Sequence, residues 1–318
     1  AVLDLAARHD HRNAPVAILV QAALGLHDTR VVGERDRIEA MRVRILTDAL
    51  DEQPVEFILR LKPGDEARVA VASYDYTVLA GTQGQKNHTK KDRIFDVARQ
   101  LRLPFILFAE GGGGRPGDTD ASGVAGLDCL AFAYFAELSG LVPLVGITNG
   151  YCFAGNAALL GCCDVIIATE DSYTGMAGPA MIEGGGLGIV KPTDIGPIDV
   201  QTANGVVDIR VSDEEEAVAV AKKYLSYFQG PLTQWERHDD ALMRDVVPEQ
   251  RTRVYDVRRA LELLADKDTL LELRPTFGIG ILTALMRIEG RPVGVIANNP
   301  AHLGGAIDSD AADKASRS

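Results

Sequence analysis

The sequence predicts an α/β protein in which apolar strands alternate with helices. Two consecutive units, residues 104–139 and 142–161, each run from an apolar strand through a glycine-bearing loop into a helix. A third apolar strand follows directly at residues 164–168. This alternation is typical of helices layered on a sheet, and the sequence contains no heptad, solenoid repeat or low-complexity tract.

Hydrophobic periodicity places the elements before and within these units. Residues 1–65 are predicted to form a partly helical lead-in, and residues 68–76 a strand. Helices are expected at residues 91–101 and 127–138, and the second is apolar on every side, which indicates burial. The helical spacing in the lead-in comes from Ile38, Met41, Ile45 and Leu46.

The C-terminal third continues the alternation. A strand is expected at residues 206–211. The helix after it begins at Ser212 with an N-cap and early acidic residues and runs to about Phe228. Residues 250–266 are predicted to be helical, and residues 279–297 to form a hairpin.

Composition limits the class of protein. The 318 residues are 46% hydrophobic and 25% charged, which is ordinary globular composition and enough for two domains or one large one. The formal net charge of −12 disfavours general nucleic-acid binding. No apolar run approaches the roughly 20 residues of a membrane span, and the start lacks the features of a signal peptide. We therefore expect a cytoplasmic protein without membrane or nucleic-acid partners.

Cysteine and histidine usage predicts no metal site. The cysteine pattern fits buried thiols in a reducing compartment better than a disulfide framework, and it lacks paired zinc-ligand spacings. His9 and His11 flank Asp10 in a ligand-like triplet, but they lie in the poorly defined lead-in. The four cysteines are Cys129, Cys152, Cys162 and Cys163.

Two glycine loops are the strongest candidates for a ligand site. Gly111–Gly114 follows one buried strand. Gly155 lies in a turn that comes after the next buried strand and begins a helix. Amides at a helix N-terminus attract a phosphate, a carboxylate or an oxyanion. Because both loops leave neighbouring strands at the same end, two backbone donors can converge on one carbonyl oxygen. Taken singly, the first loop is also compatible with a flexible connection and the second with a tight packing corner.

Other motifs give weaker signals. The loop at residues 176–188 is either a mobile surface loop or a substrate wall or lid. It lacks the glycine spacing of dinucleotide and phosphate-binding loops, and the sequence contains no nucleophile elbow. Glu110 and Glu183 each stand beside a glycine run, where a carboxylate acts as a general acid or base or supports a loop entrance.

Taken in order, these segments resemble the carboxyltransferase component of biotin-dependent acyl-CoA carboxylases. The resemblance covers roughly residues 68–318 and is specific because the motifs occur together and in this order. The matching segments are residues 74–84, 109–118, 149–164, 178–188, 203–208, 224–230 and 291–300.

The resemblance implies a crotonase-like (ClpP/crotonase) ββα superhelix with a complete N-lobe and the first part of a second lobe. Residues 1–65 are then a poorly matched lead-in, residues 66–265 the N-terminal lobe on the acyl-CoA side, and residues 266–318 the beginning of a truncated C-terminal lobe. The chain is expected to be a piece of something longer. Residues 293–299 are expected to form a strand whose natural partners are missing.

The family also implies an activity. A carboxyl group passes from carboxybiotin to the α-carbon of an acyl-CoA of the acetyl or propionyl type, and biotin itself removes the α-proton. The protein holds both substrates and stabilises the enolate with backbone amides. Biotin arrives on a partner domain or subunit, together with a biotin carboxylase. The site is shared between subunits of a homo-oligomer and needs no metal.

Site residues follow from the motif positions. The oxyanion donors are the backbone amides at Gly113, Gly114 and Gly155. Asn156 stands where a hydratase would more plausibly have an acid nearby. The expected substrate-binding residues are Arg115, Ala154, Asn156, Gly184, Gly185 and Gly186, the last three along the channel for CoA and biotin.

Two alternatives stay open at this point. One is another crotonase-type acyl-CoA enzyme, such as a hydratase, an isomerase or a decarboxylase. The other is an inactive assembly fragment. Hydration of an enoyl-CoA without biotin would favour the first, and absence of any CoA ester binding would favour the second.

Overall fold

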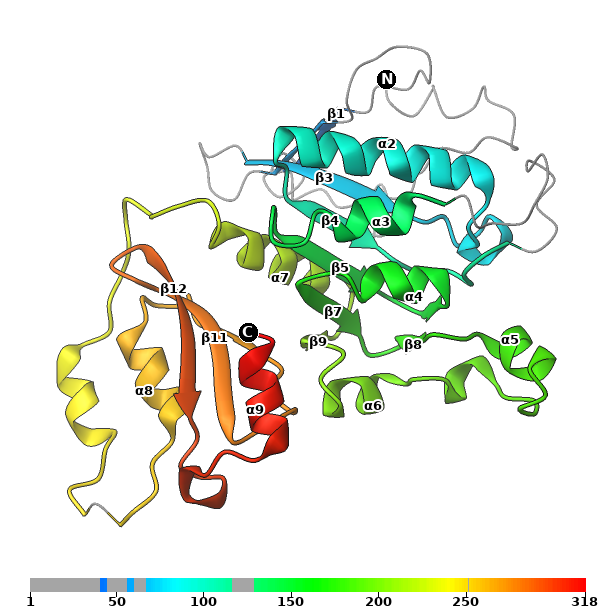
Figure 1. The fold of residues 1–318 in the computed structure, drawn as a ribbon. Coiled ribbons are helices and arrows are strands. Elements are labelled where there is room, and N and C mark those ends of the chain that lie inside the picture. Colours follow the sequence, from blue (N-terminus) through cyan, green and yellow to red (C-terminus); the bar gives the residue numbers. More distant parts are fainter. Residues whose placement is uncertain (1–40, 45–55, 60–66, 116–128, 251) are drawn as a thin grey trace, which may run out of the picture. The chain divides into compact units, whose positions relative to one another are not determined.

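The chain contains two compact units. One holds the described residues up to Ile198 together with Val211–Ala221, and the other holds Asp199–Arg210 and Lys222–Ser318. The computed structural model describes residues 41–44, 56–59, 67–115, 129–250 and 252–318 (Figure 1). The predicted division into lobes at residues 66–265 and 266–318 stays a prediction.

A seven-stranded sheet forms the centre of the first unit, in the order β1-β2-β3-β4-β5-β7-β9. Strands β3, β4, β5 and β7 pair in parallel, whereas β1 and β2 add to the sheet in antiparallel fashion. The residues of β4, β5 and β7 are buried throughout, as in a parallel sheet covered on both faces. The strands are β1 (Met41–Arg44), β2 (Glu56–Leu59), β3 (Ala67–Ser73), β4 (Phe105–Phe108), β5 (Leu144–Thr148), β7 (Val165–Thr169) and β9 (Ile209–Val211).

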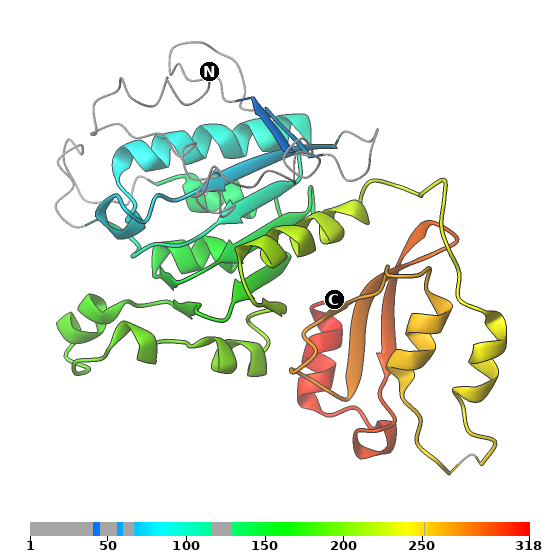
Figure 2. The same cartoon turned by 180° about the vertical axis from the view of Figure 1, so that it is seen from behind.

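Helices α2 (Gln85–Leu101), α3 (Ala131–Ala136) and α4 (Gly155–Leu160) lie side by side over one face of this sheet (Figure 1). Helix α7 (Glu214–Ser226) begins over the opposite face, which Figure 2 shows from behind. Phe95 of α2, Phe105 of β4 and Phe135 of α3 form an aromatic cluster with ring centroids 4.7 to 5.4 Å apart. All three side chains are fully buried, so this cluster anchors the helices to the sheet.

A second, smaller layer follows the sheet. Strands β6 (Tyr151–Phe153) and β8 (Tyr173–Gly175) pair in parallel. Along the chain, α5 (Pro179–Gly184) and a 3₁₀ turn at Pro192–Asp194 come next. Helix α6 (Ile198–Ala203) follows, and all but its first residue belong to the second unit. Proline in the first turn of α5 suits a helix start, because an N–H at this position would have no acceptor within the helix.

The second unit contains a three-stranded antiparallel sheet, β10 (Leu271–Leu273), β11 (Ile281–Ile288) and β12 (Arg291–Asn298). Strand β12 is an edge strand, and its residues are exposed or half-buried. The unit also contains α8 (Val257–Leu264), whose Val257 and Leu261 pack with Leu282 of β11. Helix α9 (Ser309–Ser316) packs against the same strand.

The α/β class and the predicted hairpin are confirmed, and the strands predicted at residues 68–76, 104–108, 142–148 and 164–168 all form. Helix α2 begins six residues before its predicted start, because the Gly84 amide donates to Asn87 Oδ1 at 3.0 Å in a local cap. Within the described part of the chain, no helix is both long and apolar enough to cross a membrane.

Several predicted features were wrong. Met41 lies in strand β1, because its backbone pairs with β2 rather than continuing a helix; the rest of the helical lead-in pattern lies outside the described residues. Helix α3 is shorter than predicted and buried on one face only, at Ala131 and Phe135. Of the four thiols predicted to be buried, Cys152 is buried and the others are half-buried, and all are free.

Truncation of the aromatic cluster tests its role as the anchor. Phe135→Ala is expected to lower the free energy of unfolding by about 3–5 kcal/mol, because it leaves a cavity between two buried rings. Urea unfolding followed by circular dichroism measures the loss. Leu101→Ala, at a position 54% exposed on the same helical layer, is the control and should cost less than about 0.5 kcal/mol. Equal losses would contradict the assignment.

Candidate active site

The two predicted glycine loops lie against each other. A Cβ atom added to Gly113 would come within 3.3 Å of the Gly155 nitrogen and 2.5 Å of the Ala154 Cβ. Gly113 also has φ +87°, which a residue with a side chain rarely adopts. The structure therefore brings Gly113 and Gly155 together, and only glycine fits at Gly113.

Backbone hydrogen bonds fix the first loop on both sides. On one side, Gly111 donates to Tyr151 O and accepts from the Phe153 amide, each at 2.8 Å, so the loop runs beside β6. On the other side, the Gln83 amide donates to Gly113 O at 2.7 Å, and the Arg115 amide donates to Gln83 O at 2.8 Å. Four glycines in a row thus form an ordered surface rather than a slack connection.

The side chain of Asn156 joins the two loops by hydrogen bonds. Its Oδ1 accepts from the Gly113 amide at 3.1 Å and from Gln83 Nε2 at 3.0 Å. Its Nδ2 donates to Gly81 O at 3.4 Å and to Glu110 O at 3.3 Å. The side chain is fully buried, so it supports the site from behind, and the Gly113 amide is already engaged.

The amides of Gly114 and Gly155, unlike that of Gly113, are not engaged by Asn156. Among the described residues, neither donates a hydrogen bond to another group. A Cβ on Gly114 would meet nothing within 4 Å, so this position faces open space. A Cβ on Gly155 would instead point at Gln83 Nε2, 3.2 Å away, and Phe132, 3.3 Å away. The absence of a side chain at Gly155 therefore serves packing against Gln83 and Phe132, in keeping with the packing corner that the sequence left open for this turn.

Ala154 carries the backbone strain of the site. It adopts φ 52° and ψ −121°, a conformation that costs a residue with a Cβ about 1–3 kcal/mol. Its amide donates to Gly175 O and its carbonyl accepts from the Ala158 amide, both at 2.9 Å. This sharp turn passes directly from β6 into α4 and sets the Gly155 amide at the start of the helix.

The other predicted substrate-binding residues lie beside the glycine loop or at the end of α5. The Arg115 guanidinium donates through Nε to Thr82 Oγ1 at 3.2 Å and through Nη2 to Thr82 O at 3.0 Å. It is half-buried beside the glycine loop. Gly184, Gly185 and Gly186 are exposed at the end of α5, and none of them lines the hollow described next.

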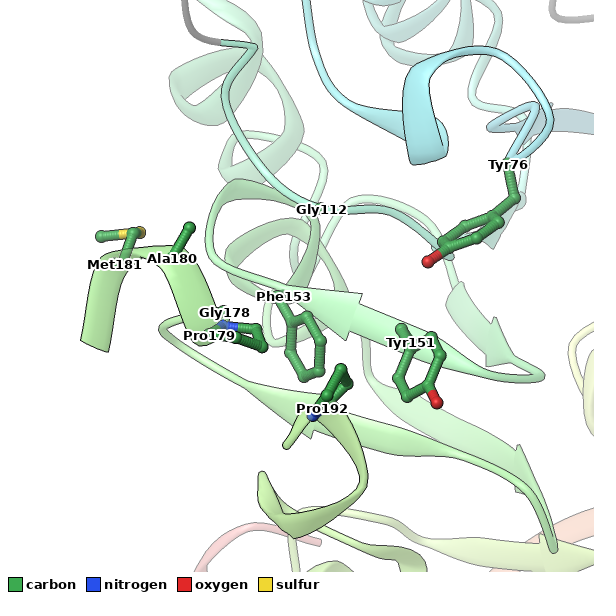
Figure 3. A pocket seen from close by; sticks show the side chains of 9 residues that line it. All are labelled: Tyr76, Gly112, Tyr151, Phe153, Gly178, Pro179, Ala180, Met181 and Pro192. Atoms are coloured by element: carbon green, nitrogen blue, oxygen red, sulfur yellow. The ribbon is translucent and has the colours of Figure 1, made fainter. Parts of the chain in front are cut away.

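A hollow of about 240 Å³ opens next to the first glycine loop and includes Gly112 in its wall. Its other walls are apolar and aromatic (Figure 3). Tyr76 comes from the segment after β3, Tyr151 and Phe153 from β6, and Met181 from α5. The hollow thus suits an apolar group with few hydrogen bonds to make.

Glu110 belongs to a polar cluster at the carboxyl ends of the central strands. Its carboxylate accepts from the Asn149 amide, and the Asn149 side chain bonds Glu214 and Thr169. Burial raises the pKa of Glu110 to about 7, and the charge of Glu214 adds to this, while the Asn149 amide opposes it. These bonds favour the supporting role of Glu110 over the acid–base role.

Sequence reasoning missed two residues of the network beneath the loops. Gln83 contacts both loops, and the buried Lys91 bonds Gln83 Oε1 at 2.7 Å. Lys91, Phe95 and Ala98 are the buried positions of α2. A charged residue in register with the apolar face of a helix was the available signal. Within the described residues no three His, Cys, Asp or Glu side chains group as metal ligands, and His9 and His11 lie outside them.

The carboxyl transferase domain family matches residues 66–318. The chain belongs to this family. It is 30% identical over 258 residues to the methylmalonyl-CoA carboxyltransferase 12S subunit of Propionibacterium freudenreichii subsp. shermanii, covering 78% of this chain and 48% of that protein. It is also 30% identical over 268 residues to the biotin-dependent long chain acyl-coenzyme A carboxylase beta4 subunit of Mycobacterium tuberculosis, covering 78% and 50%. The chain thus spans about half the length of the curated relatives it matches.

Solved carboxyltransferases share the fold. A single-chain, multi-domain long-chain acyl-CoA carboxylase matches with a TM-score of 0.75 and 61% identity, over 79% of this chain and 25% of that one. The transcarboxylase 12S hexamer, crystallised with methylmalonyl-CoA, matches with a TM-score of 0.69 and 28% identity, over 83% and 51%. These matches confirm the predicted carboxyltransferase resemblance and its crotonase-like fold.

The buried carboxyl group of Glu110 predicts a pH dependence of stability. Its pKa is raised from 4.5 to about 7, so the folded chain binds more protons than the unfolded chain between these values. The contribution of Glu110 to the free energy of unfolding is therefore largest below pH 4.5. It falls as the pH rises to about 7, by at most about 3 kcal/mol. Urea unfolding at several pH values measures this loss.

Glu110→Gln is the matched variant, because its amide oxygen can still accept from Asn149. The difference in unfolding free energy between wild type and Glu110→Gln should shrink toward low pH. A difference that is constant from pH 4.5 to 7.5 would exclude the buried-acid assignment.

Proposed function

We propose that this chain is the acyl-CoA-binding part of the carboxyltransferase of a biotin-dependent acyl-CoA carboxylase. The observation that carries the proposal is the pair of amides at Gly114 and Gly155, which have no partner among the described residues and belong to two loops in contact. Family membership supports the reaction class. Carboxybiotin, as second substrate, supplies the carboxyl group.

The two amides receive the thioester oxygen of the acyl-CoA. Loss of the α-proton converts the thioester into an enolate, whose negative charge gathers on this oxygen. Amides fixed in place stabilise that charge more than they stabilise the neutral carbonyl, and this difference accelerates the reaction. Gly113, predicted as a third donor, takes a supporting part, because its amide is bonded to Asn156.

The surrounding residues divide between holding the substrate and holding the loops. The apolar hollow next to Gly112 receives the acyl chain, with Tyr151, Phe153 and Met181 as its walls. Arg115 and Ala154 flank the thioester site, Arg115 through its charge and Ala154 through its fixed turn. Gly184, Gly185 and Gly186 lie at the end of α5 along the path of CoA.

Biotin and further partners enter from outside the described residues. We propose a biotin carrier and a biotin carboxylase as partners, and a homo-oligomer in which a second copy completes the site. The related transcarboxylase 12S structure supports this, since that protein assembles as a hexamer. The proposed place of action is the cytoplasm, in keeping with the sequence composition.

A biotin-dependent assay tests the reaction. The full natural carboxylase that contains this chain is expected to fix labelled bicarbonate into acyl-CoA in the presence of ATP, and avidin should abolish the incorporation. Propionyl-CoA and palmitoyl-CoA serve as short and long substrates. Hydration of an enoyl-CoA without biotin, or fixation that avidin leaves intact, would contradict the proposal.

Substitution at Gly114 separates the amide donor from the shape of the loop. Gly114→Pro removes the N–H and is expected to lower kcat by about 10²–10³-fold with little change in KM, as for the loss of one oxyanion donor. Gly114→Ala keeps the N–H, and its Cβ enters open space. Gly114→Ala should therefore remain within about threefold of wild type, and equal losses in both variants would assign the effect to loop shape.

A further inference from the structure

Lys91 is a buried cation beneath the glycine loops. Its side chain is 4% exposed, and Nζ donates to Gln83 Oε1 at 2.7 Å and to the Tyr74 hydroxyl at 3.0 Å. Nζ also lies 5.3 Å from the centre of the Tyr74 ring. Burial lowers the pKa of Lys91 to about 8, while the nearby Cys129 and Asp92 raise it, so the amine is still largely charged at pH 7.

A chain of amide groups leads from Lys91 to the oxyanion loop. Gln83 accepts from Lys91 through Oε1 and donates through Nε2 to Asn156 Oδ1 at 3.0 Å. That same Oδ1 accepts from the Gly113 amide at 3.1 Å. The path from the charge to the loop thus consists of three hydrogen bonds between buried groups.

Lys91 sets the donor–acceptor direction of these hydrogen bonds. Gln and Asn side chains can rotate to exchange donor and acceptor, but Lys has three donors and no acceptor. Lys91 therefore requires that Gln83 present Oε1 to it and Nε2 to Asn156. Asn156 turns Oδ1 toward Gln83 because its Nδ2 donates to the carbonyls of Gly81 and Glu110. This is the orientation that accepts from both Gln83 and Gly113.

We propose that Lys91 is a positioning residue that holds Gln83 with Nε2 toward Asn156 Oδ1, and so supports the Gly113–Gly114 loop in its oxyanion-binding form. The expected effect of Lys91 on kcat rests on the proposed function. Its structural consequence, an ordered Gly113 amide, does not depend on the reaction. Without Lys91, Gln83 can rotate, place Oε1 against Asn156 Oδ1 and weaken the bond that restrains the loop.

The test compares two cations on one helix in the full natural carboxylase. Lys91→Met removes the donor but keeps the length of the side chain. Arg93→Met is the matched control, because Arg93 is exposed and two residues further along, on the opposite side of α2. Lys91→Met is expected to lower kcat at least tenfold with KM for the acyl-CoA unchanged within twofold. Arg93→Met should retain wild-type kcat.

Hydrogen exchange gives a readout that needs no activity. Exchange of the backbone amides in residues 110–115, followed by mass spectrometry, is expected to accelerate at least tenfold in Lys91→Met and to stay unchanged in Arg93→Met. If Lys91→Met does not fold, Lys91→Gln replaces it, because an amide at this position can pair with Gln83 in either orientation. Lys91→Arg, a donor-only group, should restore much of the protection.

The outcomes separate the two proposals. Unchanged kcat and unchanged exchange in a folded Lys91 variant would overturn the positioning role while leaving the proposed function intact. Parallel changes in kcat and KM would also overturn it, because they indicate a general binding defect. An inactive wild type would remove the proposed function, and faster exchange in Lys91→Met would still support the effect of Lys91 on the loop.

Discussion

The hydrogen bond from the Gly113 amide to Asn156 Oδ1 joins the two loops on which the site depends. It connects the segment after β4 with the first turn of α4, across 43 residues of sequence. Because Asn156 is fully buried and bonds on both its oxygen and its nitrogen, each bond left unmade would cost about 1–3 kcal/mol. The relative position of the two loops is thus set by a side chain that water does not reach.

The parallel sheet makes this connection possible. Strands β4 and β5 are neighbours in register, so the loops that follow them leave the same edge of the sheet. The small sheet of β6 and β8 then carries the second loop back beside the first through the bridge between Gly111 and Cys152. Strand β6, which leads into the strained turn at Ala154, is therefore paired on both of its sides, with β8 and with Gly111. The turn cannot relax without loss of those pairs.

The sequence predicted what depends on local patterns. Strands β4, β5 and β7 are continuous apolar runs because both faces of a parallel sheet are covered. The two glycine loops follow β4 and the β5–β6 segment. Pairings between distant segments could not be predicted in this way. Met41 has helical spacing but pairs with β2, and Gln83 meets Asn156 across 73 residues. The direction of the missing Cβ at Gly155, toward Phe132, also depends on tertiary packing.

Three locally unfavourable features gather around one pair of loops. Ala154 has a positive φ, Lys91 places a cation in a nearly water-free network, and Glu110 holds a carboxyl group whose pKa burial raises to about 7. Each lowers stability, and a fold selected for stability alone would replace them with a glycine, an apolar residue and an amide. The aromatic cluster around Phe105 and the buried strands offset their cost elsewhere. Features that break local rules and concentrate at one place are typical of functional sites. They support the proposed site by an argument that is independent of the family to which the chain belongs.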